Sequence, residues 1–216
     1  MRRLLVAGAL VVLLAACDPS QPAAPPASPP MSSSASPSVA PGWAITVYYT
    51  VVEDYHGGVP TRVTGCPGLD CTDGHDDLGT YPAEFVARVR TEGTGVTAEG
   101  RFLNWSYDIG FWLDTAPRGT DGNPLEPYVS AAADPEVLAH GTRFTIAGCG
   151  RQDDGSPPPR AVCAAFQRAG WRIDDEFTPG LGGPRHIDVY VGREPGPGFT
   201  DSDAYVSLTG ATLRIS

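Results

Sequence analysis

Glycine and proline interrupt this chain so often that a bundle of long helices is excluded. Its 216 residues include 26 glycines and 22 prolines, whereas the two together make up roughly 12% of an average protein. Proline removes a backbone donor and glycine permits tight turns, so neither residue suits the interior of a helix. The sequence therefore predicts a turn-rich β domain, together with segments that build no core.

The N-terminus has the pattern of an export signal. Arg2 and Arg3 precede the apolar run Leu4–Leu14, which is shorter than the roughly 20 residues of a membrane span and fits a signal peptide. The run leads into Leu-Ala-Ala-Cys, ending at Cys17, the pattern of a bacterial lipobox. The alternative is an ordinary signal peptide followed by a chance cysteine. We expect a lipidated Cys17 and a lipid-anchored protein on the extracytoplasmic face of the bacterial cell membrane.

Residues 18–41 consist mainly of proline, alanine and serine, a composition typical of a semi-extended tether. We therefore divide the chain into a signal peptide (1–16), a lipidated cysteine with its tether (17–41) and a folded domain (42–216). The net charge is −10 and the chain contains no lysine. Because nucleic-acid binding needs a basic surface, nucleic acid is not expected as a partner.

The cysteine content agrees with export. The four cysteines after Cys17 are Cys66, Cys71, Cys149 and Cys163, and an even number in an exported chain indicates two disulfides. Of the three possible connectivities we favour Cys66–Cys71 and Cys149–Cys163, because each pair brackets an excursion rich in glycine, proline and aspartate. A zinc site would need closely spaced cysteine pairs, which the spacing does not provide. No metal or other cofactor is expected.

Many short β-branched and aromatic runs predict strands. Apolar spacing predicts short helices over Pro82–Glu92 and Ala161–Ala169, and residues 56–79 are predicted to be a loop pinned by the first cysteine pair. The predicted strands are Ala44–Val52, Arg143–Ala147, Trp171–Asp174, His186–Gly192 and others within Tyr205–Ile215. The fold class expected is mainly β, a small closed barrel with two or three short helices and disulfide-pinned loops.

One aspartate lies inside a predicted strand. In His186-Ile-Asp188-Val-Tyr190-Val, alternation places His186, Asp188 and Tyr190 on one face and the three aliphatic residues on the other. A carboxylate in such a strand is unusual, because one strand face is normally buried. The alternatives are a functional acid, a solvated face or an aspartate that caps a turn.

Two further groups leave alternatives open. Trp105, Tyr107, Phe111 and Trp112 form either a groove on which sugars stack or part of the barrel core. Asp70, Asp73, Asp76 and Asp77 form either a calcium loop or, as we favour, a solvated loop, since the EF-hand glycine and closing glutamate are absent. No Gly-x-Ser-x-Gly motif or phosphate-binding glycine loop supports serine hydrolase or nucleotide chemistry.

Several motifs occur in a fixed order between residues 129 and 192. They are Ala133-Asp134-Pro135, then His140-Gly141-Thr142-Arg-Phe-Thr-Ile, Asp175, and Gly-Leu-Gly-Gly-Pro-Arg-His-Ile-Asp188-Val-Tyr-Val-Gly192. This order resembles the 3D (Asp-Asp-Asp) domain, the double-psi β-barrel of membrane-bound lytic transglycosylase A and of the stationary-phase survival muralytic proteins. Ile45–Thr50 looks like that family's first barrel strand, which makes residues 51–128 an insertion or a groove wall.

The resemblance assigns roles to particular residues. It implies that Asp188 is the catalytic acid, that Asp175, or alternatively Asp174, is the second family aspartate, and that Asp134 is the first. The family's lysine before the last motif is absent, and the loop from Asp175 to Asp188 is two residues longer than the family pattern. Substrate-binding residues are expected to be His186, Tyr190, Arg185, Tyr49 and Trp105.

The activity implied is cleavage of the bond between N-acetylmuramic acid and N-acetylglucosamine in peptidoglycan, by a monomer. One carboxyl group protonates the leaving oxygen and then accepts the proton of the muramic C6 hydroxyl, which closes a 1,6-anhydro ring. Such an acid needs a raised pKa, which neighbouring aspartates and burial can provide. The alternative is a glycan-binding or scaffold lipoprotein without activity, because a fold does not dictate a function.

Overall fold

Strand β1 (Ser38–Val52) is the first element of the computed structural model, which describes residues 38–216. The expected signal peptide, Cys17 and most of the tether lie outside the described residues. The strand begins inside the segment expected to be tether, and Ser38 already pairs with Ile215 of the last strand. Regular structure therefore starts before residue 42.

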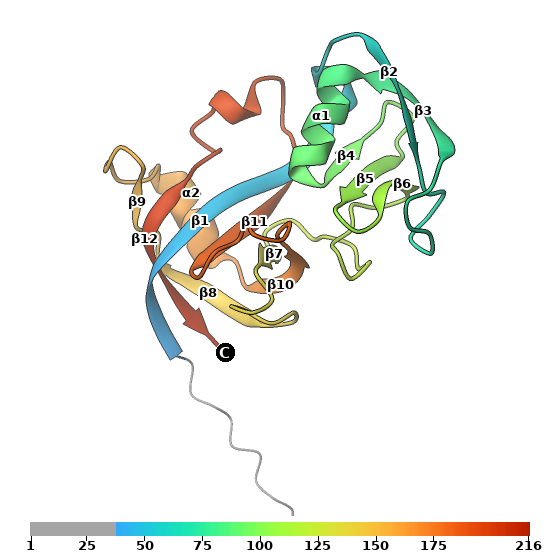
Figure 1. Cartoon of the computed structure of the whole chain (residues 1–216). Coiled ribbons are helices and arrows are strands. Elements are labelled where there is room, and N and C mark those ends of the chain that lie inside the picture. Colours follow the sequence, from blue (N-terminus) through green and yellow to red (C-terminus); the bar gives the residue numbers. More distant parts are fainter. Residues whose placement is uncertain (1–37) are drawn as a thin grey trace, which may run out of the picture. The chain divides into compact units, whose positions relative to one another are not determined.

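Six strands close into a barrel (Figure 1). Their order around the barrel is β1, β11 (His186–Arg193), β7 (Ser130–Ala133), β10 (Trp171–Glu176), β8 (Arg143–Gly148) and β12 (Leu208–Ile215), which pairs with β1 again. The pairs β1–β11 and β7–β10 are parallel, and the other neighbours are antiparallel. The expected mainly β fold with a mixed double-psi barrel is confirmed.

The far end of β1 leaves the barrel and joins a second group of strands. It pairs in parallel with β4, which continues into the antiparallel hairpin of β5 and β6. Helix α1 packs against β1, β4 and β5 (Figure 1). The bounds of these elements are α1 (Ala83–Glu92), β4 (Thr94–Val96), β5 (Phe102–Ser106) and β6 (Gly110–Asp114).

Helix α1 confirms the helix predicted from Pro82 to Glu92. Phe85 and Val89 are buried on the same face because they are four residues apart. The helix ends where Gly93 adopts a left-handed backbone, with φ of 82°, and its N–H bonds to the carbonyl of Val89. Glycine carries no Cβ penalty in that conformation, which makes it the usual residue at this position.

The prediction of a loop over residues 56–79 is wrong in part. Most of it belongs to an antiparallel hairpin of β2 (Pro60–Gly65) and β3 (Asp76–Pro82). Strand β2 contains the β-branched residues Thr61, Val63 and Thr64, but Pro60, the glycines of both strands and the acidic start of β3 give the stretch a composition typical of a loop. Val63 and Leu78 are nevertheless buried, and backbone pairing with this small apolar face supplies what strand propensity does not.

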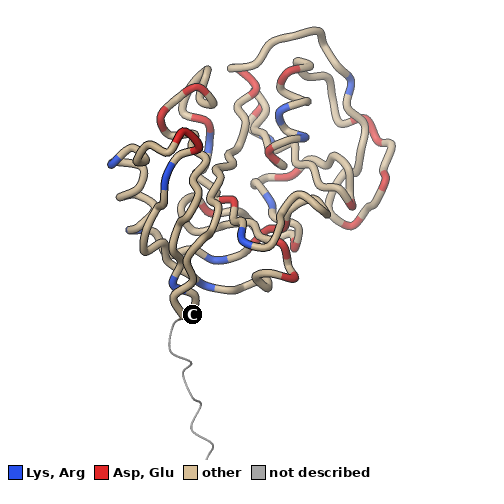
Figure 2. The backbone as a smooth tube through the Cα atoms, turned by 60° about the vertical axis from the view of Figure 1, so that its left-hand side comes forward, with Lys and Arg blue, Asp and Glu red and all other residues tan. Residues whose placement is uncertain are grey.

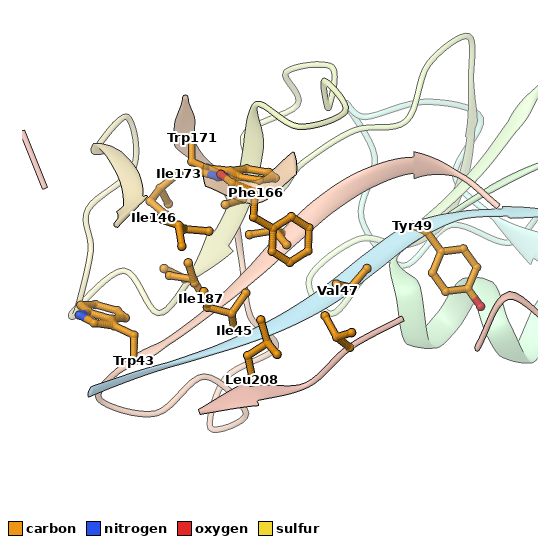
Figure 3. Packing of buried hydrophobic residues seen from close by; sticks show 14 of the residues in the cluster. Trp43, Ile45, Val47, Tyr49, Ile146, Phe166, Trp171, Ile173, Ile187 and Leu208 are labelled. Carbon is orange, nitrogen blue, oxygen red and sulfur yellow. The ribbon is translucent and has the colours of Figure 1, made fainter. Parts of the chain in front are cut away.

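The barrel core is built by alternation along the strands. Trp43, Ile45 and Val47 of β1 point inward together with Ile187 of β11 and Leu208 of β12 (Figure 3). Helix α2 (Arg160–Arg168) adds Phe166, whose backbone carbonyl accepts a hydrogen bond from Trp171 Nε1 at 3.1 Å. Short pieces complete the structure: η1 (Glu53–Tyr55), β9 (Arg151–Gln152) and η2 (Phe199–Asp201).

Both favoured disulfides are present. Cys149–Cys163 ties the end of β8 to α2. Cys66–Cys71 closes the loop after β2, and the backbone N–H of Cys66 donates to the carbonyl of Phe111 on β6 at 2.8 Å. The first disulfide thus fixes a segment that borders β6.

Basic residues are scattered singly along the chain, and acidic residues outnumber them (Figure 2). Among the helices of residues 38–216, none has the length and apolar content needed to cross a membrane.

Candidate active site

A cavity of about 180 Å³ lies between the barrel and the second group of strands. The barrel side contributes residues of β1, β7, β10 and β11. The facing side contributes the end of α1 and residues of β5 and β6. The residues that matter here are Tyr48, Glu92, Trp105, Trp112, Gly119, Thr120, Ala132, Asp175 and Asp188. We call this cavity the cleft.

The register of three strands places the two acids of the cleft in one row. Ala132 of β7 is paired with Asp188 of β11 on one side and with Asp175 of β10 on the other. Adjacent strands are about 4.8 Å apart, so the two acidic positions are separated by roughly 10 Å of sheet. The small side chain of Ala132 leaves the space between the two carboxyl groups open to the cleft.

An irregularity in β10 decides which of two consecutive aspartates faces the cleft. Ile173 pairs with Ala131 and Asp175 with Ala132, so Asp174 is left without a partner in the register. Asp174 is buried and accepts a hydrogen bond from the Ser130 hydroxyl at 2.7 Å, and it also binds Arg172. Because a bulge re-aims side chains, the role of the cleft acid falls to Asp175 rather than Asp174.

Burial makes Asp188 a carboxyl group that can hold a proton near neutral pH. It raises the pKa of Asp188 to about 7, and the charge of Asp175 adds to this effect. Oδ1 of Asp188 is buried and has no hydrogen-bond partner within the protein. Burial also raises the pKa of Asp175, to about 6, although the N–H groups of Glu176 and Thr120 donate to its carboxylate and act in the opposite direction.

Of the expected site residues, Asp188, Asp175 and Trp105 line the cleft. His186 lies beside it: Nδ1 donates to the carbonyl of Gly182 at 3.0 Å, so the neutral ring accepts at Nε2 from the Thr46 hydroxyl at 2.8 Å. Burial lowers the pKa of His186, which favours this neutral form. His186 therefore orients Thr46, the residue paired with Asp188 across β1 and β11.

The structure places four other expected residues outside the cleft lining. Asp134 begins a turn, where Oδ1 accepts the N–H of Glu136 at 3.0 Å. Arg185 binds the carbonyl of Pro41. The Tyr190 hydroxyl is buried against Thr50 Oγ1 at 2.6 Å. Tyr49 packs edge-on against the aromatic rings of Phe199 and Tyr205 (Figure 3 shows it among the core side chains).

The sequence analysis did not identify Tyr48 and Glu92 as site residues, although the residue pattern around each of them indicates its position. Ile45, Val47 and Tyr49 alternate as the buried face of β1, so Tyr48 belongs to the opposite face, which meets the cleft. Glu92 follows Val89 by three residues, which places it on the apolar face of α1. An acid among the buried residues of a helix is unusual, and this is the signal that could have identified Glu92.

The four aromatic residues expected to form either a sugar-stacking groove or part of the core lie in the hairpin of β5 and β6, and they divide between these two alternatives. Trp105, Tyr107 and Trp112 line the cleft, whereas Phe111 does not and packs against the core. The Tyr107 side chain is exposed and Arg90 lies over the Trp105 ring, at 5.5 Å from its centre.

The acidic loop shows no metal cage. Within residues 38–216, no group of three or more histidine, cysteine, aspartate or glutamate residues could hold a metal ion. Asp77 instead accepts hydrogen bonds from Arg62 at 3.0 Å and from the Gly79 N–H at 3.1 Å.

Gly119 is expected to tolerate no side chain. A Cβ at this position would lie 2.2 Å from the carbonyl oxygen of Asp174, so Gly119→Ala must displace the loop whose next residue, Thr120, binds Asp175. We expect a loss of about 1–3 kcal/mol in the free energy of unfolding, as for other overpacked sites. Urea unfolding measures it, with Gly196→Ala as the control because nothing lies within 4 Å there. Equal stability of the two variants would contradict the close approach of Gly119 to β10.

Comparison with known proteins supports the fold. No family model matches the chain, and no curated protein matches its sequence. Among solved structures, Escherichia coli MltA with bound chitohexaose is similar with a TM-score of 0.54 and 14% identity, over 82% of this chain and 72% of that one. A membrane-bound lytic murein transglycosylase from Agrobacterium tumefaciens is similar with a TM-score of 0.48 and 12% identity, over 80% and 73% of the two chains.

The lytic transglycosylase LtgG of Burkholderia pseudomallei gives a TM-score of 0.43 at 14% identity, over 81% of this chain and 71% of that one. At these identities the likeness concerns the fold. Of these three structures, that of E. coli MltA alone has a TM-score above 0.5. This chain shares the barrel architecture of that lytic transglycosylase.

Proposed function

We propose that this protein is a peptidoglycan lytic transglycosylase in which Asp188 is the general acid and base. The observation that carries the proposal is the environment of Asp188: a half-buried aspartate with a pKa of about 7 and a buried, unpartnered Oδ1, facing a cleft. The likeness to MltA, which was solved with bound chitohexaose, supports a glycan as the ligand. The motif resemblance to the 3D domain supports the same role for Asp188.

The reaction balances with this one carboxyl group. Protonated Asp188 gives its proton to the glycosidic oxygen as the bond to C1 of N-acetylmuramic acid breaks. The resulting carboxylate then takes the proton of the C6 hydroxyl, whose oxygen attacks C1 and closes the 1,6-anhydro ring. The proton returns to Asp188, and no water is consumed.

Asp175 would contribute to this reaction through the negative charge of its carboxylate. With a pKa of about 6 it is mainly ionised at neutral pH, when Asp188 still holds a proton in a large fraction of molecules. Its negative charge would stabilise the positive charge that develops at C1. The two backbone N–H groups that donate to Asp175 favour its ionised form, whereas Asp188 Oδ1 has no such donor, and this difference assigns the electrostatic role to Asp175 and the acid role to Asp188.

The cellular setting is a further part of the proposal. A signal peptide over residues 1–16, lipidation of Cys17 and a tether would hold a monomeric enzyme on the outer face of the cell membrane, within reach of glycan strands. Labelling with a radioactive fatty acid in a bacterial host tests it. Label on the parent and none on Cys17→Ser supports the anchor, and an unlabelled parent contradicts it.

Digestion of purified peptidoglycan tests the proposed activity directly. Mass spectrometry of the products is expected to show 1,6-anhydro muropeptides, which weigh one water less than hydrolysed products. Asp188→Asn is expected to release none. Binding to peptidoglycan without any release would favour a glycan-binding protein, and hydrolysed products would indicate a glycosidase that uses water.

A further inference from the structure

Glu92 is a buried acid on the wall of the cleft that faces the barrel strands. It is the last residue of α1, its side chain is only 3% exposed, and it lines the same cavity as Asp188. The glycine that follows turns the chain away, so the carboxyl group is fixed at the end of a rigid helix. Nothing in the proposed mechanism uses this group.

Unpartnered polar atoms gather in the cleft. Eight buried side-chain nitrogen and oxygen atoms in residues 38–216 have no hydrogen-bond partner, and four of them belong to residues that line this cavity. These four are Tyr48 Oη, Glu92 Oε1, Trp112 Nε1 and Asp188 Oδ1. Because buried polar groups are normally hydrogen-bonded, such a concentration indicates a ligand that supplies the missing partners.

The groups around Glu92 keep its carboxyl group uncharged. Arg88 Nη1 is 3.9 Å from Oε1, which is too far for a hydrogen bond, and the acids Asp188 and Glu194 face it. Burial is the largest influence, and together with Asp188 it raises the pKa of Glu92 to about 8 against the effects of Arg88 and the Tyr49 backbone. Tyr205 is the remaining titratable neighbour, and its hydroxyl forms a hydrogen bond with the Glu92 side chain. The group therefore retains a proton that it can donate.

We propose that Glu92 binds the glycan directly, as a neutral acid that donates one hydrogen bond to an uncharged oxygen of a sugar unit. The identity of the ligand as a glycan rests on the proposed function. Tyr48 and Trp112 line the same cavity and carry further unpartnered donors, so the cleft offers several neutral donors to the oxygens of the sugar. Glu92 is a substrate-binding residue and takes no proton in the reaction.

Calorimetric binding of chitohexaose tests the proposal. All variants carry Asp188→Asn so that the ligand is not cleaved, and all are measured at mildly acidic pH. Glu92→Gln keeps an N–H donor and is expected to bind within about threefold of the parent. Glu92→Leu removes the donor and is expected to bind about five- to tenfold more weakly, the usual effect of one lost hydrogen bond. The exposed Glu99 provides the matched control, Glu99→Leu, which should bind as the parent does.

Two readouts separate binding from a structural role. The parent's affinity should fall as the pH rises through the pKa of Glu92, which the loss of the Asp188 charge moves below its value of about 8 in the unmodified protein, whereas the affinity of Glu92→Gln should not fall. The melting temperature of Glu92→Leu should stay within a few degrees of that of the parent, because removal of a buried acid offsets the loss of its hydrogen bonds with the Tyr49 backbone and the Tyr205 hydroxyl. Weak binding by a destabilised Glu92→Leu, without a pH effect, would overturn the proposal.

The test also distinguishes the two proposals. If the unmodified protein releases anhydro products and Glu92→Leu binds as tightly as the control, the role of Glu92 is overturned while the proposed function stands. If the unmodified protein does not digest peptidoglycan and the Asp188→Asn parent does not bind chitohexaose, both are overturned.

Discussion

Replacing Asp188 with asparagine is expected to reduce release of anhydro muropeptides by roughly 10²–10⁴-fold, the usual contribution of a general acid and base. Asparagine has nearly the same shape but holds no transferable proton at this position. Affinity for chitohexaose should change little, because the amide can still hydrogen-bond to the sugar. Initial rates of product release, measured with binding on the same preparations, check this expectation.

Asp134→Asn is the matched control. Asp134 belongs to the same family motif, yet its carboxylate caps a turn outside the cleft lining. Asparagine can accept the same backbone hydrogen bond, so we expect a loss in rate below about threefold. A loss as large as that of Asp188→Asn would contradict the division of roles between the two aspartates.

Stability is expected to fall as the pH rises from about 4 to about 8. Burial raises the folded-state pKa of Asp175 to about 6, of Asp188 to about 7 and of Glu92 to about 8. A raised pKa means that the folded protein holds a proton that the unfolded chain loses. The stabilisation is therefore complete below the unfolded pKa values and disappears as the pH passes the folded ones.

The expected size of this effect is a few kcal/mol. One unit of pKa shift corresponds to about 1.36 kcal/mol, and solvent in the cleft reduces the total, so we expect about 2–4 kcal/mol between pH 5 and pH 8. Urea unfolding at the two pH values measures it. Asp188→Asn and Glu92→Gln should each flatten the dependence, and a parent protein that gains stability with rising pH would contradict the assignment.

Local pattern was enough to predict the elements that carry the site. The alternation of His186-Ile-Asp188-Val identified an acid on the non-core face of a strand, and the spacing of Phe85 and Val89 predicted α1. The cysteine spacing also led to the correct disulfide pairs. These features depend on periodicity and short-range chemistry, which are present in the sequence itself. The hairpin of β2 and β3 was missed because the proline, glycine and acidic residues within its short strands are typical of a loop.

Which residues meet in the cleft depends on the closed barrel. Asp188 and Asp175 lie in one row because both pair with Ala132, and the irregularity that leaves Asp174 out of register turns Asp175 toward the cavity. Glu92 reaches the same cavity because the extended end of β1 brings α1 to it. The strands, the helix and the acidic residue types follow from the sequence, because each depends on neighbours along the chain. Register and bulges arise from hydrogen bonds between distant segments, so the partners of each acid emerge only when those segments pair.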